Sequence, residues 1–141
     1  MRIQRKLLEL NFLINIVKEL TPEIVVFENV PEMKDTLIEY DNKLINIIDF
    51  INEELSPLGY FGTAEVVEFA DYGVPQRRNR LVLLASKLGP IKMIDPTTPE
   101  GKRKTVKQAI SNLPKINAGH RHPEDPLHQS QGLSELNLKR I

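Results

Sequence analysis

Apolar residues recur with helical spacing in two stretches of the first half of the chain. The first stretch, residues 3–20, is predicted to be a helix that a Thr-Pro pair at residues 21–22 stops. The second stretch predicts a helix over residues 35–55, which the sequence Pro-Leu-Gly at residues 57–59 closes. Between them, residues 24–27 form a continuously apolar run, which is typical of a strand that is buried on both faces.

Two further runs, residues 60–69 and 80–85, are predicted to be strands. Strands joined through a helix are normally parallel, so the strands at 24–27 and 60–69 should end at the same edge of a sheet. The connection over residues 70–79 is too short for a crossover, and the strand after it should therefore run antiparallel. The expected fold class is α/β, with part of a Rossmann-like sheet of parallel strands and a final antiparallel strand. Sheets of this class bind ligands at their carboxyl edge.

The second half of the chain is irregular in sequence. Six of the ten prolines lie between residues 90 and 126, and short helices are expected near residues 105–112 and 133–138. We therefore expect two parts, an α/β part over residues 1–88 and a loop-rich part over residues 89–141.

Charge is distributed unevenly, although the formal net charge is zero. Residues 1–75 carry 6 Lys and Arg against 14 Asp and Glu, whereas residues 76–121 carry 11 against 2. A cationic half suits a polyanion, and nucleic acid is the commonest one, although charges also cluster by chance on folded surfaces. Lys102, Arg103 and Lys104 are therefore candidates for phosphate contacts, with an ordinary solvated basic loop as the alternative.

Candidate chemistry gathers at the predicted carboxyl edge of the sheet. Glu28 follows the first strand, and Arg78 and Arg80 stand at the start of the last one. Taken singly, the glutamate is a loop cap or a surface ion pair, and the arginines form a solvated strand end. Together they combine an acid that can protonate a ring nitrogen with donors for a neighbouring carbonyl oxygen, and cytosine presents such an edge.

Two motifs in this region resemble those of the DNA cytosine-5 methyltransferases. Residues 28–30, Glu-Asn-Val, resemble the ENV motif of that family, and residues 76–80, Gln-Arg-Arg-Asn-Arg, resemble its Gln-x-Arg-x-Arg motif. Residues 105–114 and 128–141 resemble the stretch that leads into the family's target-recognition region. The resemblance implies that the α/β part is the second half of an S-adenosylmethionine-dependent catalytic domain. It implies that the loop-rich part is the start of the target-recognition region.

In that family a cysteine thiolate attacks carbon 6 of a cytosine flipped out of the DNA duplex, and carbon 5 then takes a methyl group from S-adenosylmethionine. The resemblance implies that Glu28 binds ring nitrogen 3 and the exocyclic amine. It implies that Arg80 holds the carbonyl oxygen and that Arg78 supports the flipped nucleotide. The candidate substrate- and DNA-binding residues are Gln76, Arg77, Asn29, Lys102, Arg103 and Lys104. Of these, Asn29 is better suited to bracing the turn than to touching substrate.

The sequence departs from the family pattern in two respects. It contains no cysteine, and no glycine-rich loop follows a first strand, so the nucleophile and the main cofactor-binding loop are absent from it. We expect the isolated chain to be inactive, and to act on double-stranded DNA when a complementary methyltransferase half completes it. By itself it should associate through an exposed sheet edge. The alternatives are a non-catalytic module that binds DNA or a partner, and an incomplete product that folds poorly.

Metal binding and membrane insertion are not expected. His120, Arg121 and His122 resemble a metal motif only superficially, because no cysteine and no carboxylate stand at ligand spacing. The sequence has no apolar run of about eighteen residues and no signal-peptide pattern. These absences favour a cytoplasmic protein, and the resemblance implies a nucleoid-associated protein of a restriction-modification system.

Overall fold

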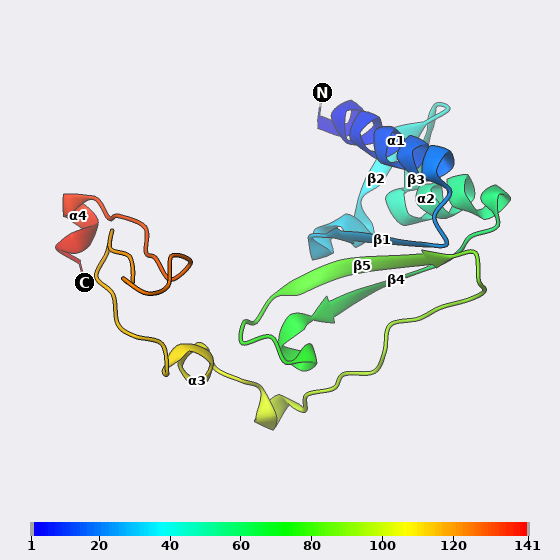
Figure 1. Cartoon of the computed structure of the whole chain (residues 1–141). Coiled ribbons are helices and arrows are strands. Elements are labelled where there is room, and N and C mark those ends of the chain that lie inside the picture. The colour runs from blue at the N-terminus through cyan, green and yellow to red at the C-terminus, as the bar shows by residue number, and fades with distance from the viewer. Residues whose placement is uncertain (1, 141) are drawn as a thin grey trace. The chain divides into compact units, whose positions relative to one another are not determined.

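The computed structural model describes residues 2–140, with side chains from residue 8 onward (Figure 1). Its contacts divide the chain into two compact units, Met1–Lys104 and Thr105–Ile141. The first unit combines helices and strands, so the mixed α/β class is confirmed. The boundary between residues 88 and 89 stays a functional prediction, because residues 89–104 belong to the first compact unit.

A three-stranded sheet, sheet A, contains β1 (Ile24–Asn29), β5 (Asn79–Ser86) and β4 (Phe61–Glu68), in that order across the sheet. β5 pairs antiparallel with both of its neighbours. The antiparallel final strand is therefore confirmed, and β1 and β4 run in the same direction. The predicted Rossmann-like sheet of parallel strands is not confirmed, because β5 turns back beside β4 and lies between β4 and β1, so that every pairing described in sheet A is antiparallel.

β1 is buried on one face and not on both, which corrects the prediction from its apolar sequence. Val25 is 8% exposed, whereas Ile24 and Val26 are 51% and 59% exposed. Successive side chains of a strand point to opposite faces. The face that carries Val25 and Phe27 packs into the hydrophobic core, and the other face of β1 is open.

α1 (Arg2–Leu20) confirms the first predicted helix. It ends where Thr21 adopts a positive φ of 42°, directly before Pro22. One stripe of the helix faces the core, which joins buried side chains from helices and strands. The core residues are Leu10, Ile14, Val17, Val25, Ile38, Ile47, Phe50, Ile51, Leu55, Tyr60, Leu83 and Ala85.

The predicted helix over residues 35–55 is wrong in its first half. In its place the structure has a 3-10 helix, η1 (Pro31–Asp35), followed by a hairpin of β2 (Leu37–Tyr40) and β3 (Lys43–Asn46). Asp41 and Asn42 both adopt positive φ angles, 49° and 59°, as the favoured two-residue hairpin turn requires.

α2 (Ile47–Leu55) follows the hairpin directly. It begins where the Asn46 side chain accepts a hydrogen bond from the Ile48 amide at 2.8 Å. It continues into η2 (Ser56–Leu58) and stops at Gly59, whose φ of 86° suits glycine, so the predicted end is confirmed. α1, α2 and the hairpin lie on one side of sheet A (Figure 1).

Residues 87–104 leave β5 and run beside β4, with a short turn of helix, η4 (Glu100–Lys102), near their end (Figure 1). Side-chain hydrogen bonds attach the first part of this segment, residues 87–96. Thr63 Oγ1 donates to the Ile91 carbonyl oxygen at 3.0 Å, and the Tyr72 hydroxyl donates to the Ile94 carbonyl oxygen at 3.0 Å. The segment is therefore part of the first unit although it contains no strand.

The second unit is loop-rich, as predicted. Its short helices are α3 (Val106–Ile110) and α4 (Glu135–Leu138), and both confirm the sequence-based expectation. Thr105 and Gln108 form a capping box at the start of α3. Across the described part of the chain, no helix combines the length and apolar character that crossing a bilayer requires.

Candidate functional site

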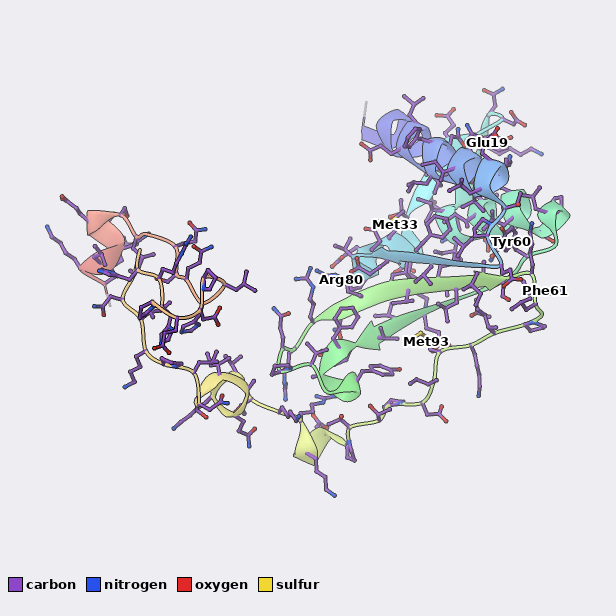
Figure 2. The ribbon with its side chains drawn as sticks, in the orientation of Figure 1. Glu19, Met33, Tyr60, Phe61, Arg80 and Met93 are labelled. Carbon is purple, nitrogen blue, oxygen red and sulfur yellow. The ribbon has the colours of Figure 1, made fainter. Side chains whose placement is uncertain are left out.

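The ends of β1 and β4 and the start of β5 meet at one edge of sheet A. Pairing of Asn29 with Leu81 and of Glu68 with Asn79 places all three strand ends there. Figure 2 shows Arg80 at this edge and Phe61, the first residue of β4, at the far end of the sheet. The candidate residues of both sequence motifs are therefore brought to the same place.

Glu28 and Arg80 form an ion pair at this edge, with 2.7 Å between Glu28 Oε1 and Arg80 Nε. Glu28 lies opposite Val82 in the register. Because Arg80 precedes Val82 by two residues, it lies on the same face of the sheet and diagonal to Glu28. Arg80 Nη1 also donates to the Asn79 carbonyl oxygen at 2.7 Å. The structure thus brings Glu28 and Arg80 together as the sequence predicts, and their roles toward a substrate stay predictions.

The two members of the pair differ in their exposure. The Arg80 side chain is 14% exposed, whereas the Glu28 side chain is 51% exposed. The guanidinium is therefore held by surrounding protein, while the carboxylate stays open to a ligand. Ion pairs with an exposed partner contribute about 1 kcal/mol or less to stability. The ion pair therefore contributes little to the stability of the fold.

The arginine loop, residues 73–78, connects η3 (Phe69–Tyr72) to β5. Glu68, at the end of β4, accepts hydrogen bonds on Oε1 from the Ala70 amide at 3.3 Å and from the Arg78 amide at 2.6 Å. The Phe69 amide donates to the Arg78 carbonyl oxygen at 3.1 Å. The backbone of Arg78 is therefore fixed on both sides, although among the described ion pairs it is Arg80, and not Arg78, that contacts Glu28.

Gln76, Arg77 and Arg78 all have exposed side chains in the arginine loop. These three residues are candidates from the sequence, whereas Glu68, which anchors the loop, is not among the predicted residues. The signal for Glu68 would have been an acidic residue at a strand end, just before a turn whose amides need acceptors.

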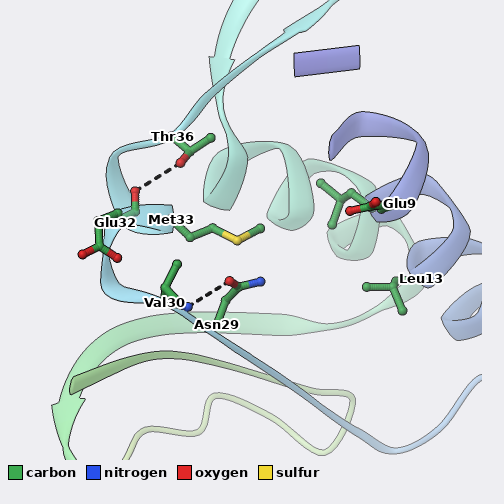
Figure 3. Close-up of a pocket in the computed structure, with 8 residues that line it drawn as sticks. Glu9, Leu13, Asn29, Val30, Glu32, Met33 and Thr36 are labelled. Carbon is green, nitrogen blue, oxygen red and sulfur yellow. Dashed lines mark hydrogen bonds between the residues drawn. The ribbon is translucent and has the colours of Figure 1, made fainter. Parts of the chain in front are cut away.

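A pocket of about 270 Å³ lies beside the loop that follows β1 (Figure 3). Its lining comes from α1, the end of β1 and η1: Glu9, Leu10, Leu13, Asn29, Val30, Glu32, Met33 and Thr36. Asn29 Oδ1 accepts a hydrogen bond from the Val30 amide at 2.8 Å, so this side chain braces the turn. Adjacent residues of a strand point to opposite faces, so the pocket and the Glu28–Arg80 pair lie on opposite sides of the sheet.

The basic segment, residues 102–104, contains two kinds of side chain. Lys102 and Lys104 are exposed. Arg103 is instead paired with Asp71, with 2.7 Å between Arg103 Nε and Asp71 Oδ1, and its Nη2 contacts the same oxygen. The hydrogen bond to Asp71 raises the pKa of the Arg103 guanidinium above its ordinary value, and the charge of Glu100 adds to this effect. Lys102 and Lys104 stay candidates for phosphate contacts, with a solvated basic loop as the alternative.

The histidines make local contacts within the second unit. The rings of His122 and His128 pack edge to face with their centroids 5.8 Å apart, and His128 Nε2 lies 2.8 Å from the Pro114 carbonyl oxygen. His120 Nδ1 lies 3.1 Å from the Ala118 carbonyl oxygen. Within residues 2–140, no three side chains of metal-ligating type gather in one place.

Comparison with known proteins identifies similar sequences. The sequence profile of the C-5 cytosine-specific DNA methylases matches residues 7–136. The Type II methylase M.HgiDII of Herpetosiphon aurantiacus is 40% identical over 127 residues, which cover 89% of this chain and 34% of the relative. The Type II methyltransferase M1.HgaI of Avibacterium volantium is 31% identical over 128 residues, which cover 91% of this chain and 34% of the relative. The chain thus spans about a third of the length of these curated relatives.

Among solved structures, the Entamoeba histolytica methyltransferase EhMeth aligns with a TM-score of 0.46 and 21% sequence identity. The alignment covers 74% of this chain and 28% of that chain.

Proposed function

This chain belongs to the C-5 cytosine-specific DNA methylase family, and from that membership we propose that it supplies the cytosine-binding half of a DNA cytosine-5 methyltransferase. The Glu28–Arg80 ion pair carries the proposal, because an exposed acid and a fixed guanidinium stand together where the two motifs meet. Double-stranded DNA is the proposed substrate and S-adenosylmethionine the methyl donor. The proposed setting is a cytoplasmic, nucleoid-associated enzyme of a restriction-modification system.

Each residue has a defined part in the proposed reaction. Glu28 binds ring nitrogen 3 and the exocyclic amine of a flipped cytosine and stabilises the protonated ring. Arg80 donates to the carbonyl oxygen of the base and holds the Glu28 carboxylate in place. Arg78 supports the flipped nucleotide and its phosphate, and Gln76 shapes the loop beside it. A charged donor placed where charge develops in the transition state contributes on the order of 3 kcal/mol.

The proposed enzyme consists of two polypeptide segments. The cysteine nucleophile and the main cofactor-binding loop come from a complementary half, and this chain by itself is inactive. S-adenosylmethionine supplies the methyl group that the activated carbon 5 accepts. The residues of this chain bind and orient the cytosine, and they stabilise the positive charge on its ring. The open face and edge of β1 offer the complementary half a surface on which to dock.

A reconstitution experiment tests this proposal. The chain is mixed with a polypeptide that carries the cofactor loop and the Pro-Cys motif, and transfer of labelled methyl groups to duplex DNA is measured. We expect transfer in the mixture, and a loss of about a hundredfold or more for Glu28→Gln. Glu65→Gln is the matched control. Glu65 is also an exposed carboxylate paired with Val82, but it lies in β4, on the other side of β5 from Glu28, and on the same face of the sheet. Equal activities of the two variants would contradict the role of Glu28.

A second function, a non-catalytic module that binds DNA, is favoured by the exposed positive side chains of the arginine loop and the basic segment. It predicts DNA binding that weakens steeply with salt, and no methyl transfer after addition of any complementary half. Methyl transfer in the reconstituted mixture would rule this function out.

A further inference from the structure

We propose that Arg103 is a positioning residue, whose ion pair with Asp71 holds the basic segment beside the arginine loop, and not a phosphate contact. The inference rests on the proposed function, because it concerns how the same chain presents its positive charges to DNA. From charge alone, all three side chains of residues 102–104 are predicted to contact phosphate, and the proposed role of Arg103 differs from that prediction.

Asp71 forms hydrogen bonds to residues 97–103 through both its side chain and its main chain. The carboxylate accepts hydrogen bonds from Arg103, at 2.7 Å from Nε. The carbonyl oxygen of Asp71 accepts from the Thr98 amide at 2.8 Å and from Thr97 Oγ1 at 3.4 Å. Residues 97–103 are otherwise a segment without strand pairing, so these contacts at one residue determine where the segment lies.

The short helix η3, which contains Asp71, also fixes the arginine loop. Glu68 caps η3 and holds the Arg78 amide at 2.6 Å, while Asp71, within η3, holds Arg103. Two carboxylates three positions apart, at the cap of η3 and within it, therefore attach the arginine loop and the basic segment to one short helix. As a consequence, the spacing between the backbone of Arg78 and residue 103 is constrained, and the lysines at 102 and 104 flank that attached position.

The guanidinium of Arg103 is already engaged by acids. Its side chain is 19% exposed, and besides Asp71 it lies 3.5 Å from Glu100 through Nη1. A phosphate would have to compete with two carboxylates for donors that are arranged in a planar fork. Lys102 and Lys104 carry no such ion pair among the described residues, and they are exposed.

The variant Asp71→Asn distinguishes the two readings by the sign of its effect on DNA binding by the full chain. If Arg103 contacts phosphate, removal of a negative charge frees the guanidinium and strengthens binding. If Arg103 positions the basic segment, loss of the ion pair weakens binding by roughly threefold or more. We expect weakening, and the same weakening for Arg103→Lys, which keeps the charge but loses the fork geometry. Glu65→Gln is the control, because it removes a negative charge that has no contact with Arg103 and should leave binding equal or slightly stronger.

Amide hydrogen exchange measures the positioning separately from DNA. We expect Asp71→Asn and Arg103→Lys to increase the exchange rate of the Thr98 amide by roughly tenfold, and Lys104→Gln to leave it unchanged. Stronger DNA binding by Asp71→Asn, or unchanged exchange at Thr98, would overturn the inference. If the unmodified chain binds no DNA by itself, the exchange experiment alone decides whether the ion pair holds residues 97–103, and the reconstitution experiment decides the proposed function separately.

Discussion

Glu28 and Arg80 come together because of strand register. The pairing of Glu28 with Val82 places Arg80 on the same face, two residues away along β5. A register slip of one residue would move every side chain of β5 to the opposite face and separate the pair. Because the anchored arginine loop sets where β5 begins, Glu68 supports the site although its side chain lies outside it.

Gly62 marks a second position where a single residue determines packing. A Cβ at Gly62 would lie 2.2 Å from Asn52 Oδ1, so β4 approaches α2 through the space that glycine leaves. We expect Gly62→Ala to lower the free energy of unfolding by about 1 kcal/mol or less, because the Asn52 amide group ends a flexible side chain that can turn away from the added methyl group. Chemical denaturation of the purified chain measures the effect. In an Asn52→Ala background the same substitution should be nearly neutral, and an equal loss in both backgrounds would contradict the packing explanation.

The sequence predicted that Glu28 and Arg80 lie together, but it did not predict the residues that hold the arginine loop and the basic segment. Glu28 and Arg80 stand next to strand ends and belong to spaced motifs, so local sequence and topology were enough to bring them together. Glu68 and Asp71 were missed because their partners, Arg78 and Arg103, lie 10 and 32 positions away. An acidic residue near a turn has many possible partners, and the tertiary fold selects among them.

At the level of elements, residues 35–46 show why a helical stripe can mislead. The apolar residues before α2 fit a helix by spacing, but Asp41 and Asn42 are residues that tolerate positive φ. The hairpin turn uses that tolerance, and it lets Ile38 reach the core with 0% exposure. The prediction for β1 is wrong for another reason. An apolar run predicts burial on both faces of a strand, but the sequence does not show whether a second layer covers the second face.

The hairpin turn can be tested at Asn42. We expect Asn42→Val to destabilise the chain by about 1 to 2 kcal/mol, because a β-branched side chain disfavours the left-handed conformation. Asn42→Gly should be neutral or slightly stabilising, since glycine adopts positive φ without strain. Lys43→Val serves as the matched control, because Lys43 is the next residue, is also exposed and lies in β3. Thermal unfolding that ranks Asn42→Val equal to Lys43→Val would refute the turn assignment.

At the level of the whole molecule, the first unit exposes apolar surface along α1 and β1. Leu8, Phe12 and Leu20 of α1 are exposed, as are Ile24 and Val26 of β1. The Lys87 amide bonds to the Glu23 carbonyl oxygen, so the alternate residues 24, 26 and 28 direct their backbone groups away from β5 toward the free edge of β1. Open backbone groups and apolar side chains on the same strand favour pairing with another chain.

We therefore expect the isolated chain to self-associate in a concentration-dependent manner. Val26→Lys should reduce this association strongly, because a charged side chain on the edge strand opposes strand addition. Leu127→Lys, at an exposed apolar residue of the second unit, is the control and should leave the association unchanged. Sedimentation velocity over a range of concentrations gives the measurement. A monomeric unmodified chain would contradict the expectation.

The central place of β5 in sheet A affects how the chain can fold during its synthesis. β1 leaves the ribosome long before Asn79–Ser86, which form its described neighbour in the sheet. At about 5–20 residues per second, the nascent β1 waits on the order of seconds without that neighbour. During this interval its apolar residues are available to chaperones, or to the strands of any other polypeptide that has already been made.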